Sequence, residues 1–155
     1  MLSSKVAKPD MELTIRIFDR SQIMEAVSLY QKVFKSEPWN DNDSDEEVTE
    51  YFSNMLSNDM FLGYAAYYNG RIAALSAGFV KPWVKGFEYY IDQFCVDIDL
   101  QGKGIGTEFL AFIEKDLHGK RINNIFLLTV RAFPSYGFYK KNGFIDNDRL
   151  CCLSK

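Results

Sequence analysis

The chain has 155 residues, a formal net charge of −3 and three cysteines. This length suits one compact domain with a single hydrophobic core, so we predict one domain over residues 1–155, with residues 1–10 flexible. The acidic balance argues against a nucleic-acid-binding surface, and no apolar run is long enough for a signal peptide or a membrane span. The cysteines have neither disulfide nor zinc spacing. We therefore predict a reduced, cytoplasmic protein that holds no metal.

Two amphipathic helices are predicted in the first third of the chain. Asp19 and Gln22 have the spacing of a capping box, in which each side chain satisfies a free backbone N–H group at a helix start. Ser44 and Glu47 have the same spacing. Apolar residues recur at helical spacing after each box, and on the second helix this stripe includes Tyr51. Each stripe predicts one buried helix face.

Alternating or continuous apolar runs predict the strands. The predicted strands cover 12–18, 60–68, 71–80, 87–96 and 124–130, and residues 144–153 supply one or two closing strands. Asn69-Gly70 links two of them, because both residues tolerate the positive φ of a tight hairpin. Residues 81–86 are predicted to form a loop, and two further helices are predicted over 105–119 and 134–139.

The order of these elements decides how the strands pair. A helix that crosses between two long strands implies parallel pairing, whereas tight hairpins imply antiparallel pairing. The predicted fold class is therefore α/β (α+β), with one mixed sheet of six to seven strands and about four helices on its two faces.

The segment Gln101-Gly102-Lys103-Gly104-Ile105-Gly106 lies where the strand that ends at Val96 leads into a helix. A phosphate site needs free backbone N–H groups and close approach of the chain, and glycines at a helix N-terminus provide both. The spacing excludes a Walker A loop, and the G-x-G-x-G order late in the chain differs from a dinucleotide fingerprint. The alternative is a glycine-rich turn that only joins strand to helix.

A second motif follows about thirty residues later. Phe138-Tyr139-Lys140-Lys141-Asn142-Gly143-Phe144 has the pattern F-Y-x-x-x-G-F, and the earlier segment reads Gln101-x-x-Gly104-x-Gly106. Together, in this order and at this separation, the two motifs resemble those of the GNAT family of N-acetyltransferases. The resemblance covers residues 12–144 and implies the family's mixed sheet, splayed between its fourth and fifth strands to admit the pantetheine arm of acetyl-CoA.

The resemblance implies acetyl-CoA as the co-substrate. The cofactor-binding residues that it implies are Phe94, Cys95, Val96, Gln101, Gly102, Lys103, Gly104, Ile105, Gly106, Thr107, Ser135, Phe138, Tyr139 and Lys141. The family often has Asn seven residues before the tyrosine and Ala four residues before it, where this chain has Ala132 and Ser135. This departure affects one side-chain contact to the pantetheine arm and leaves the backbone phosphate site unchanged.

Acetyl transfer to an amine requires a base. A pH of 7 is about three units below the pKa of a lysine-like amine, so deprotonation of such an amine costs roughly 4 kcal/mol. Asp92 is our first candidate because a carboxylate is unusual inside a strand. Ile91-Asp92-Gln93 also resembles the aminoglycoside 6′-N-acetyltransferases, in which the matching Asp is the proposed base. Glu88 is the second candidate, and a hydrogen-bonded structural carboxylate is the alternative reading of Asp92.

Tyr139 is the candidate general acid for the departing thiolate. A phenol with a pKa near 10 can protonate a thiolate with a pKa near 8.5 in a dry site. Periodicity alone favours a core tyrosine, whereas the F-Y-x-x-x-G-F resemblance favours the acid role. The oxyanion is expected to meet backbone N–H groups around Phe94 to Val96, where the family's strand carries a bulge.

Trp39 and Asp92 are the residues predicted to contact the acceptor. Trp39 is followed by five acidic residues, Asp41, Asp43, Asp45, Glu46 and Glu47. Such acidity can attract a polyamine, an aminoglycoside or a basic peptide end, but acidic residues at a helix N-terminus are common and explain it better. Trp39 and Trp83 either line the acceptor pocket or fill it.

We expect an N-acetyltransferase that moves an acetyl group from acetyl-CoA to a primary amine of a small cationic molecule, aminoglycoside- or polyamine-like, by direct attack. Two alternatives stay open: a protein or peptide N-terminal or lysine acetyltransferase, and a catalytically silent acyl-CoA-binding module. The departures at Ala132 and Ser135 support the silent module. Many members of the family are homodimers, so the resemblance also suggests a homodimer.

Overall fold

The computed structural model describes residues 12–155, so the segment predicted to be flexible, 1–10, lies outside the described residues. The strands are β1 (Leu13–Ile17), β2 (Phe61–Tyr68), β3 (Arg71–Trp83), β4 (Gly86–Val96) and β5 (Asn124–Leu127). The helices are α1 (Ile23–Phe34), α2 (Asp45–Leu56), α3 (Ile105–Gly119) and α4 (Pro134–Lys141), with 3-10 turns η1 (Arg20–Gln22) and η2 (Ile98–Leu100). No helix in this part of the chain is long and apolar enough to cross a bilayer.

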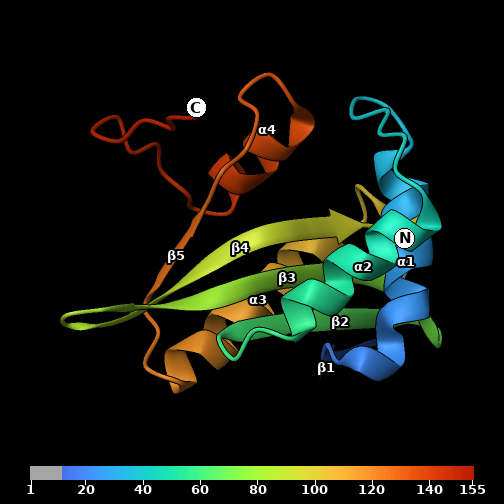
Figure 1. Ribbon diagram of the computed structural model, residues 1–155, viewed down its shortest axis with the longest axis horizontal. Coiled ribbons are helices and arrows are strands. Elements are labelled where there is room, and N and C mark those ends of the chain that lie inside the picture. Colours follow the sequence, from blue (N-terminus) through green and yellow to red (C-terminus); the bar gives the residue numbers. More distant parts are fainter. Residues whose placement is uncertain (1–11) are drawn as a thin grey trace, which may run out of the picture.

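The five strands lie in the sheet in chain order, β1-β2-β3-β4-β5 (Figure 1). The first four are antiparallel, and β5 runs parallel to β4 because α3 crosses between them. The predicted hairpin at Asn69-Gly70 is confirmed, since both residues have positive φ, 50° and 76°. The predicted loop over 81–86 is wrong in its first half, because β3 continues to Trp83 and pairs there with Gly86.

Helices cover the two faces of the sheet and form two separate apolar clusters. On one face α1 and α2 bury Val33, Phe52 and Cys95. On the other face α3 buries Phe109 and Ile113 against the sheet. In Figure 1, α2 lies in front of the sheet and α3 behind it. The mixed sheet with helices on both faces is therefore confirmed.

Both predicted capping boxes form. The backbone N–H of Asp19 donates to Gln22 Oε1 at 2.8 Å, while the Asp19 side chain accepts at the start of η1. At the start of α2 the Ser44 hydroxyl accepts from the backbone of Glu47 at 3.2 Å, and the Glu47 carboxylate accepts from the backbone of Ser44 at 2.7 Å. These bonds satisfy N–H groups that a helix start leaves free.

β4 carries one extra residue relative to β3, at Asp92. Ala77 pairs with Gln93 and Gly78 pairs with Ile91, which leaves Asp92 without a β3 partner. Such a β-bulge changes the face that the following side chains reach. Phe94 accordingly joins the same cluster as Ile91, on the α3 face. Strict alternation would have put these two side chains on opposite faces.

Gly78 makes room for this bulge. A Cβ atom built on Gly78 would lie 2.1 Å from the carbonyl oxygen of Tyr90. The β3 backbone thus approaches β4 more closely than any residue with a side chain permits, which is a known reason for glycine inside a strand. The bulge and the glycine opposite it are one structural feature.

β5 is shorter and less covered than predicted. It pairs with β4 only from Glu88↔Asn124 to Ile91↔Leu127, so the pairing ends one residue before the bulge. Leu128, the next residue, is 67% exposed. The predicted strand over 124–130 is therefore wrong after Leu127, because β4 turns away and offers no further partner.

The predicted closing strands over 144–153 are also wrong, so the described sheet has five strands instead of six to seven. Asp146 is held beside α4, where its carboxylate accepts from the Tyr136 hydroxyl at 2.9 Å and pairs with Lys140 and Arg131, each at 3.1 Å. The backbone then turns, with the Leu150 N–H bonded to the carbonyl of residue 147. These contacts lead the chain along α4 and away from the free edge of β5.

Replacing Gly78 with alanine is expected to lower the free energy of unfolding by about 1–3 kcal/mol, because the new methyl group meets a backbone oxygen of the neighbouring strand. Urea denaturation followed by circular dichroism measures this loss. The control is Gly119→Ala at the end of α3, where a Cβ meets no atom within 4 Å. The control is expected to be neutral or slightly stabilising. Equal effects of the two substitutions would contradict the close approach at Gly78.

Candidate active site

β4 and β5 separate at the bulge. Ile91 is the last β4 residue with a β5 partner, so residues 92–96 of β4 continue without a neighbour on that side. Figure 1 shows β4 and β5 diverging from each other along their length. This opening, formed by residues 92–96 and the chain after Leu127, is named the β4–β5 splay. The predicted separation of the fourth and fifth strands is thereby confirmed.

The backbone of β4 presents hydrogen-bond donors to the splay. The Asp97 N–H donates to the carbonyl oxygen of Ala73 on β3 at 2.8 Å. Bonds to one neighbour alternate along an antiparallel strand, so the N–H groups of Phe94 and Val96 point away from β3 and toward the splay. The bulge expected around Phe94 to Val96 lies instead at Asp92, because Gly78 provides the space there.

The glycine segment joins β4 to α3 as predicted. Gly102 and Gly104 have φ of +74° and +90°, a region that favours glycine. Gly104 is the N-cap residue of α3, and no side chain caps this helix, in contrast to the full capping box of α2. The first-turn N–H groups of Ile105, Gly106 and Thr107 have no intrahelical partners. Together with the helix dipole they can hold an anionic phosphate group.

Side chains brace this segment against β4 and α1. The Gln101 amide donates to the last carbonyl of β4 at 3.0 Å, and the Lys103 ammonium donates to the carbonyl of Asp99 at 3.0 Å. Lys32 of α1 pairs with Asp97 at 2.5 Å and with Asp99 at 2.6 Å. Its single positive charge is thereby shared between two carboxylates next to the glycine segment and offsets one of their two negative charges. Lys32 is a residue that the sequence could not reveal, because its partners lie 65 and 67 positions away.

Aromatic rings connect β4 to the second motif. Phe94 stacks on Phe138 of α4 at 5.5 Å between ring centroids and packs against Phe109 of α3, also at 5.5 Å. A Cβ atom at Gly106 would lie 3.1 Å from the Phe138 ring, so this glycine lets α3 approach α4 closely. Tyr139 lies edge-on to Phe138 at 5.3 Å. The structure therefore brings the two sequence motifs together.

Tyr139 is buried near Cys95. Its side chain is 7% exposed, and burial, with a further contribution from the Cys95 thiolate form, raises the pKa of the phenol above its ordinary value. Burial likewise raises the pKa of the Cys95 thiol to about 12. Tyr139 thus stays protonated and can donate a proton, whereas a buried neutral thiol is a poor nucleophile.

The two candidate carboxylates have different surroundings. Asp92 lies at the bulge and accepts a hydrogen bond from the hydroxyl of Tyr51 on α2. Glu88 lies four residues earlier, about 13 Å along the strand. Its oxygens contact the Asn124 amide at 2.9 Å and the Lys81 ammonium at 3.5 Å. The structure thus brings Asp92, and not Glu88, together with the splay.

Trp39 links the loop between α1 and α2 to the second motif. Its ring packs edge-on against Phe34 of α1 at 5.3 Å and against Phe133, the N-cap residue of α4, at 5.9 Å. Trp83 instead lies at the far β3–β4 hairpin, is 58% exposed, and has the Lys81 ammonium 4.4 Å from its ring centroid. Trp83 is therefore remote from the splay.

The acidic residues after Trp39 divide into two groups. Burial, followed by the charges of Asp43 and Asp41, raises the pKa of Tyr30 to about 12, and Asp92 contributes in the same direction. The negative charges of these carboxylates therefore act on the same phenol. Glu47 instead caps α2 and Asp45 accepts from Gln31 at 2.9 Å, which are ordinary structural roles. Asp45 and Glu46 also lie in the first turn of α2, where negative charge is favourable.

The other predicted cofactor residues differ in how their side chains are placed. Ser135 shares a hydrogen bond with Thr129 at 2.9 Å. Thr107 and Lys141 are exposed, whereas the Ile105 side chain is buried in the core, so only its backbone can reach a ligand. Among residues 12–155, no group of three or more His, Cys, Asp or Glu side chains is placed so that it could hold a metal ion.

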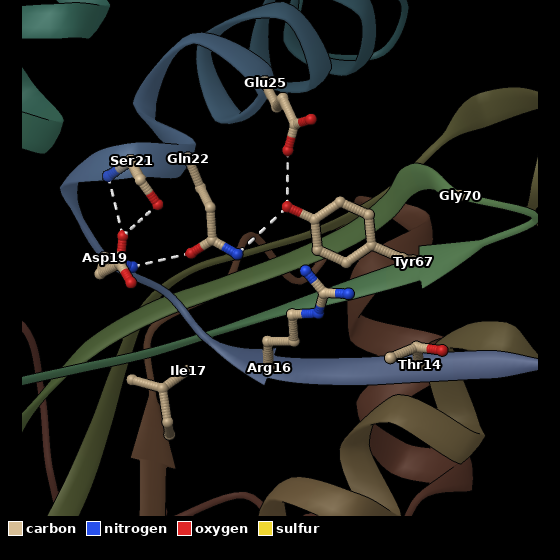
Figure 2. Close-up of a pocket in the computed structure, with 9 residues that line it drawn as sticks. All are labelled: Thr14, Arg16, Ile17, Asp19, Ser21, Gln22, Glu25, Tyr67 and Gly70. Carbon is tan, nitrogen blue, oxygen red and sulfur yellow. Dashed lines mark hydrogen bonds between the residues drawn. The ribbon is translucent and has the colours of Figure 1, made fainter.

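Two hollows lie on the surface of the described residues, and the larger one adjoins the splay. A groove of about 1760 Å³ borders β5, α4 and the C-terminal segment, and Tyr139 reaches it from the inside. A hollow of about 570 Å³ lies between β1 and the start of α1 (Figure 2). There the Gln22 amide donates to the Tyr67 hydroxyl at 3.1 Å, and that hydroxyl donates to Glu25 at 2.6 Å. This network holds the start of α1 on β2 and lies apart from the splay.

Comparisons with known proteins agree with this geometry. Residues 24–144 match the model of the acetyltransferase (GNAT) family. A predicted acetyltransferase from Clostridium acetobutylicum, solved with acetyl-CoA, is 27% identical with a TM-score of 0.68, over 92% of this chain and 96% of that one. An aminoglycoside N-acetyltransferase in complex with CoA has a TM-score of 0.74 at 13% identity, over 97% and 99% of the two chains. An aminoglycoside acetyltransferase from an uncultured soil metagenomic sample has a TM-score of 0.70 at 17% identity, over 92% and 95%.

No match was found among curated proteins. The family match nevertheless spans β4, the glycine segment, α3 and the second motif, which are the parts that form the splay and its surroundings. The chain therefore belongs to the acetyltransferase (GNAT) family, whose members are acetyl-CoA-dependent acetyltransferases.

Proposed function

We propose that this protein transfers an acetyl group from acetyl-CoA to a primary amine of a small cationic molecule, with Asp92 as the general base. The observation that carries the proposal is the position of Asp92, at the bulge where the splay opens. Two similar structures are of aminoglycoside acetyltransferases, which supports a cationic acceptor. The negative charges of Asp43, Asp41 and Asp92, each of which raises the pKa of Tyr30, are a further support for a cationic acceptor.

The residues around the splay fit acetyl-CoA. When bound, acetyl-CoA supplies the thioester whose acetyl group is transferred. The uncapped start of α3 offers N–H donors for the pyrophosphate, and Lys103 adds a positive charge. The N–H groups of Phe94 and Val96 are donors in a partly dehydrated place, where developing negative charge on an acyl oxygen is best stabilised.

Asp92 and Tyr139 supply the two proton transfers. Removing a proton from a lysine-like amine at neutral pH costs roughly 4 kcal/mol, and a carboxylate within hydrogen-bond reach, directly or through one water, lowers that barrier. Tyr139 donates a proton to the departing sulfur. Cys95 is the thiol near this place, and because it stays neutral and buried, we infer direct attack by the amine instead of transfer through a cysteine.

A panel of aminoglycosides, polyamines and peptides tests the acceptor class, with free thiol release as the readout. We expect turnover with a small polycationic amine. Asp92→Asn is expected to lower kcat by about 10²- to 10⁴-fold with little change in acetyl-CoA affinity, because a general base is lost. Glu88→Gln is the companion variant on the same strand, and it is expected to affect stability more than rate, since Glu88 is already bonded to Asn124.

Each other outcome of this panel identifies a different function. Turnover confined to peptides favours a protein or peptide acetyltransferase. Acetyl-CoA binding with no turnover on any amine favours the catalytically silent module. A loss of rate in Glu88→Gln with full activity in Asp92→Asn reverses the two carboxylate roles.

Gly104→Ala is expected to weaken CoA binding about tenfold or more, because the alanine resists the positive φ that aims the first N–H groups of α3. Isothermal titration calorimetry with CoA measures the affinity. Gly70→Ala is the matched control, since Gly70 has a similar φ of +76° at the β2–β3 hairpin. Both variants should lose similar stability, and only Gly104→Ala should lose affinity. Equal CoA affinities of Gly104→Ala and Gly70→Ala would contradict a phosphate-binding role for this segment.

Tyr139→Phe is expected to lower kcat about 10- to 100-fold, because the proton donor is lost while the ring remains. Because burial raises the pKa of Tyr139, its neutral, proton-donating form persists to higher pH than that of a free phenol. The wild-type rate should therefore show no decline due to this group between pH 8 and 10. Tyr136→Phe, on the same helix, is the control. A wild-type rate in Tyr139→Phe would exclude the acid role.

The single domain over residues 1–155, the cytoplasmic location and the homodimer remain predictions. So does the absence of a nucleic-acid partner. Light scattering of the purified protein measures the assembly state, and we expect a mass of two chains.

A further inference from the structure

Tyr51 lies on α2, on a different element from every residue assigned above to the reaction. By helical spacing it belongs to the apolar stripe of α2, and its ring does pack with the rings of Phe52 at 5.2 Å and Tyr30 at 6.4 Å. Its hydroxyl, however, leaves this cluster and bonds to Oδ2 of Asp92, 41 positions away in the sequence. The residue thus connects the helical layer to the bulge.

In this hydrogen bond Tyr51 is the donor. Burial raises the pKa of the Tyr51 phenol well above its ordinary value, and the bond to Asp92 and the charge of that carboxylate raise it further. The proton therefore stays on the phenol oxygen, and the carboxylate accepts. Tyr51 cannot exchange roles with Asp92 over the pH range in which proteins are assayed.

The donor is held on a rigid element. α2 starts with a complete capping box, and its residue next to Tyr51, Phe52, is fully buried against α1 and the sheet. Asp92, by contrast, is the one β4 residue at this point with no partner in β3. A side chain on a bulge needs an external contact to fix its direction, and Tyr51 provides one.

The bond occupies only one side of the carboxylate. A carboxylate has two acceptor oxygens, so a bond at Oδ2 leaves Oδ1 for a second partner. Tyr90, two residues earlier on β4, also approaches Asp92: burial, then the charge of Asp92 and a contact of its carboxylate with the Tyr90 hydroxyl, raise the pKa of the Tyr90 phenol. The Tyr90 ring packs on Phe126 of β5 at 4.8 Å. The arrangement has the form of a base that is oriented by a third group.

We propose that Tyr51 is a positioning residue, which holds Asp92 through Oδ2 so that Oδ1 faces the acceptor amine. The inference rests on the proposed role of Asp92 as the base. It assigns a function to α2 beyond covering the sheet, because this helix then fixes the orientation of the reacting group.

A double-mutant cycle tests this inference. Tyr51→Phe keeps the ring and its packing but removes the donor, so it is expected to lower kcat about 10- to 100-fold and to leave the KM for acetyl-CoA unchanged. In the Asp92→Asn background the same substitution should have no further effect on the residual rate, because Tyr51 acts only through Asp92. Rates are measured by thiol release with the best acceptor from the panel.

Tyr67→Phe is the matched control. It also removes a tyrosine hydroxyl that donates to a carboxylate, that of Glu25, but it does so in the hollow of Figure 2, away from the splay. Tyr67→Phe is expected to keep the wild-type kcat, and the melting temperatures of the two variants show whether their losses of stability are similar. A comparable fall of kcat in both variants would make the effect of Tyr51 one of stability alone and overturn the inference.

The remaining outcomes separate this inference from the proposed function. If Asp92→Asn is impaired and Tyr51→Phe is fully active, Tyr51 has no positioning role while Asp92 keeps its own. If Tyr51→Phe lowers kcat by the same factor in both backgrounds, Tyr51 acts independently of Asp92, and the inference is wrong. If Asp92→Asn is fully active, the proposed base itself is wrong, and the inference fails with it.

Discussion

The close approach of Gly78 to the carbonyl of Tyr90 is the constraint on which the site depends. Because a glycine stands there, β3 and β4 stay paired on both sides of an extra residue, and that residue is Asp92. The β4–β5 pairing ends at Ile91, one residue before the bulge, and the splay opens there. It also shifts the side-chain alternation, so that Phe94 packs with α3 and α4. One backbone irregularity thus determines which side chains reach each face of the sheet.

The two faces of the sheet therefore contribute different groups to the site. On the α3 face, Phe94 stacks with Phe138 and brings the second motif beside the uncapped start of α3. On the α1–α2 face, Asp92 accepts a hydrogen bond from Tyr51, and its charge acts on Tyr30 together with those of Asp41 and Asp43. The proposed co-substrate side is built from backbone donors and rings, whereas the proposed acceptor side is built from carboxylates and phenols. This division matches the chemistry of a phosphate-bearing thioester and a cationic amine.

Features governed by neighbours in the sequence could be predicted. The capping boxes, the Asn69-Gly70 hairpin and the turn into α3 depend on a few adjacent residues, and all of them form. The bulge could not be placed, because its cause is a glycine on another strand. No sequence signal indicated the carboxylate partners of Lys32 or of the Tyr51 hydroxyl either, since each residue meets them only through the fold. The extent of β5 and the missing closing strands likewise depended on where β4 turns away and on how Asp146 is held against α4.

A crystal structure with CoA and a polycationic amine acceptor bound together tests most directly whether the bulge aims the Asp92 carboxylate at the acceptor amine. We predict that the reacting nitrogen lies within hydrogen-bond reach of Asp92, directly or through one water, and beside the sulfur of CoA. An amine bound at the Glu88 end of β4, or one with no carboxylate in reach, would contradict it.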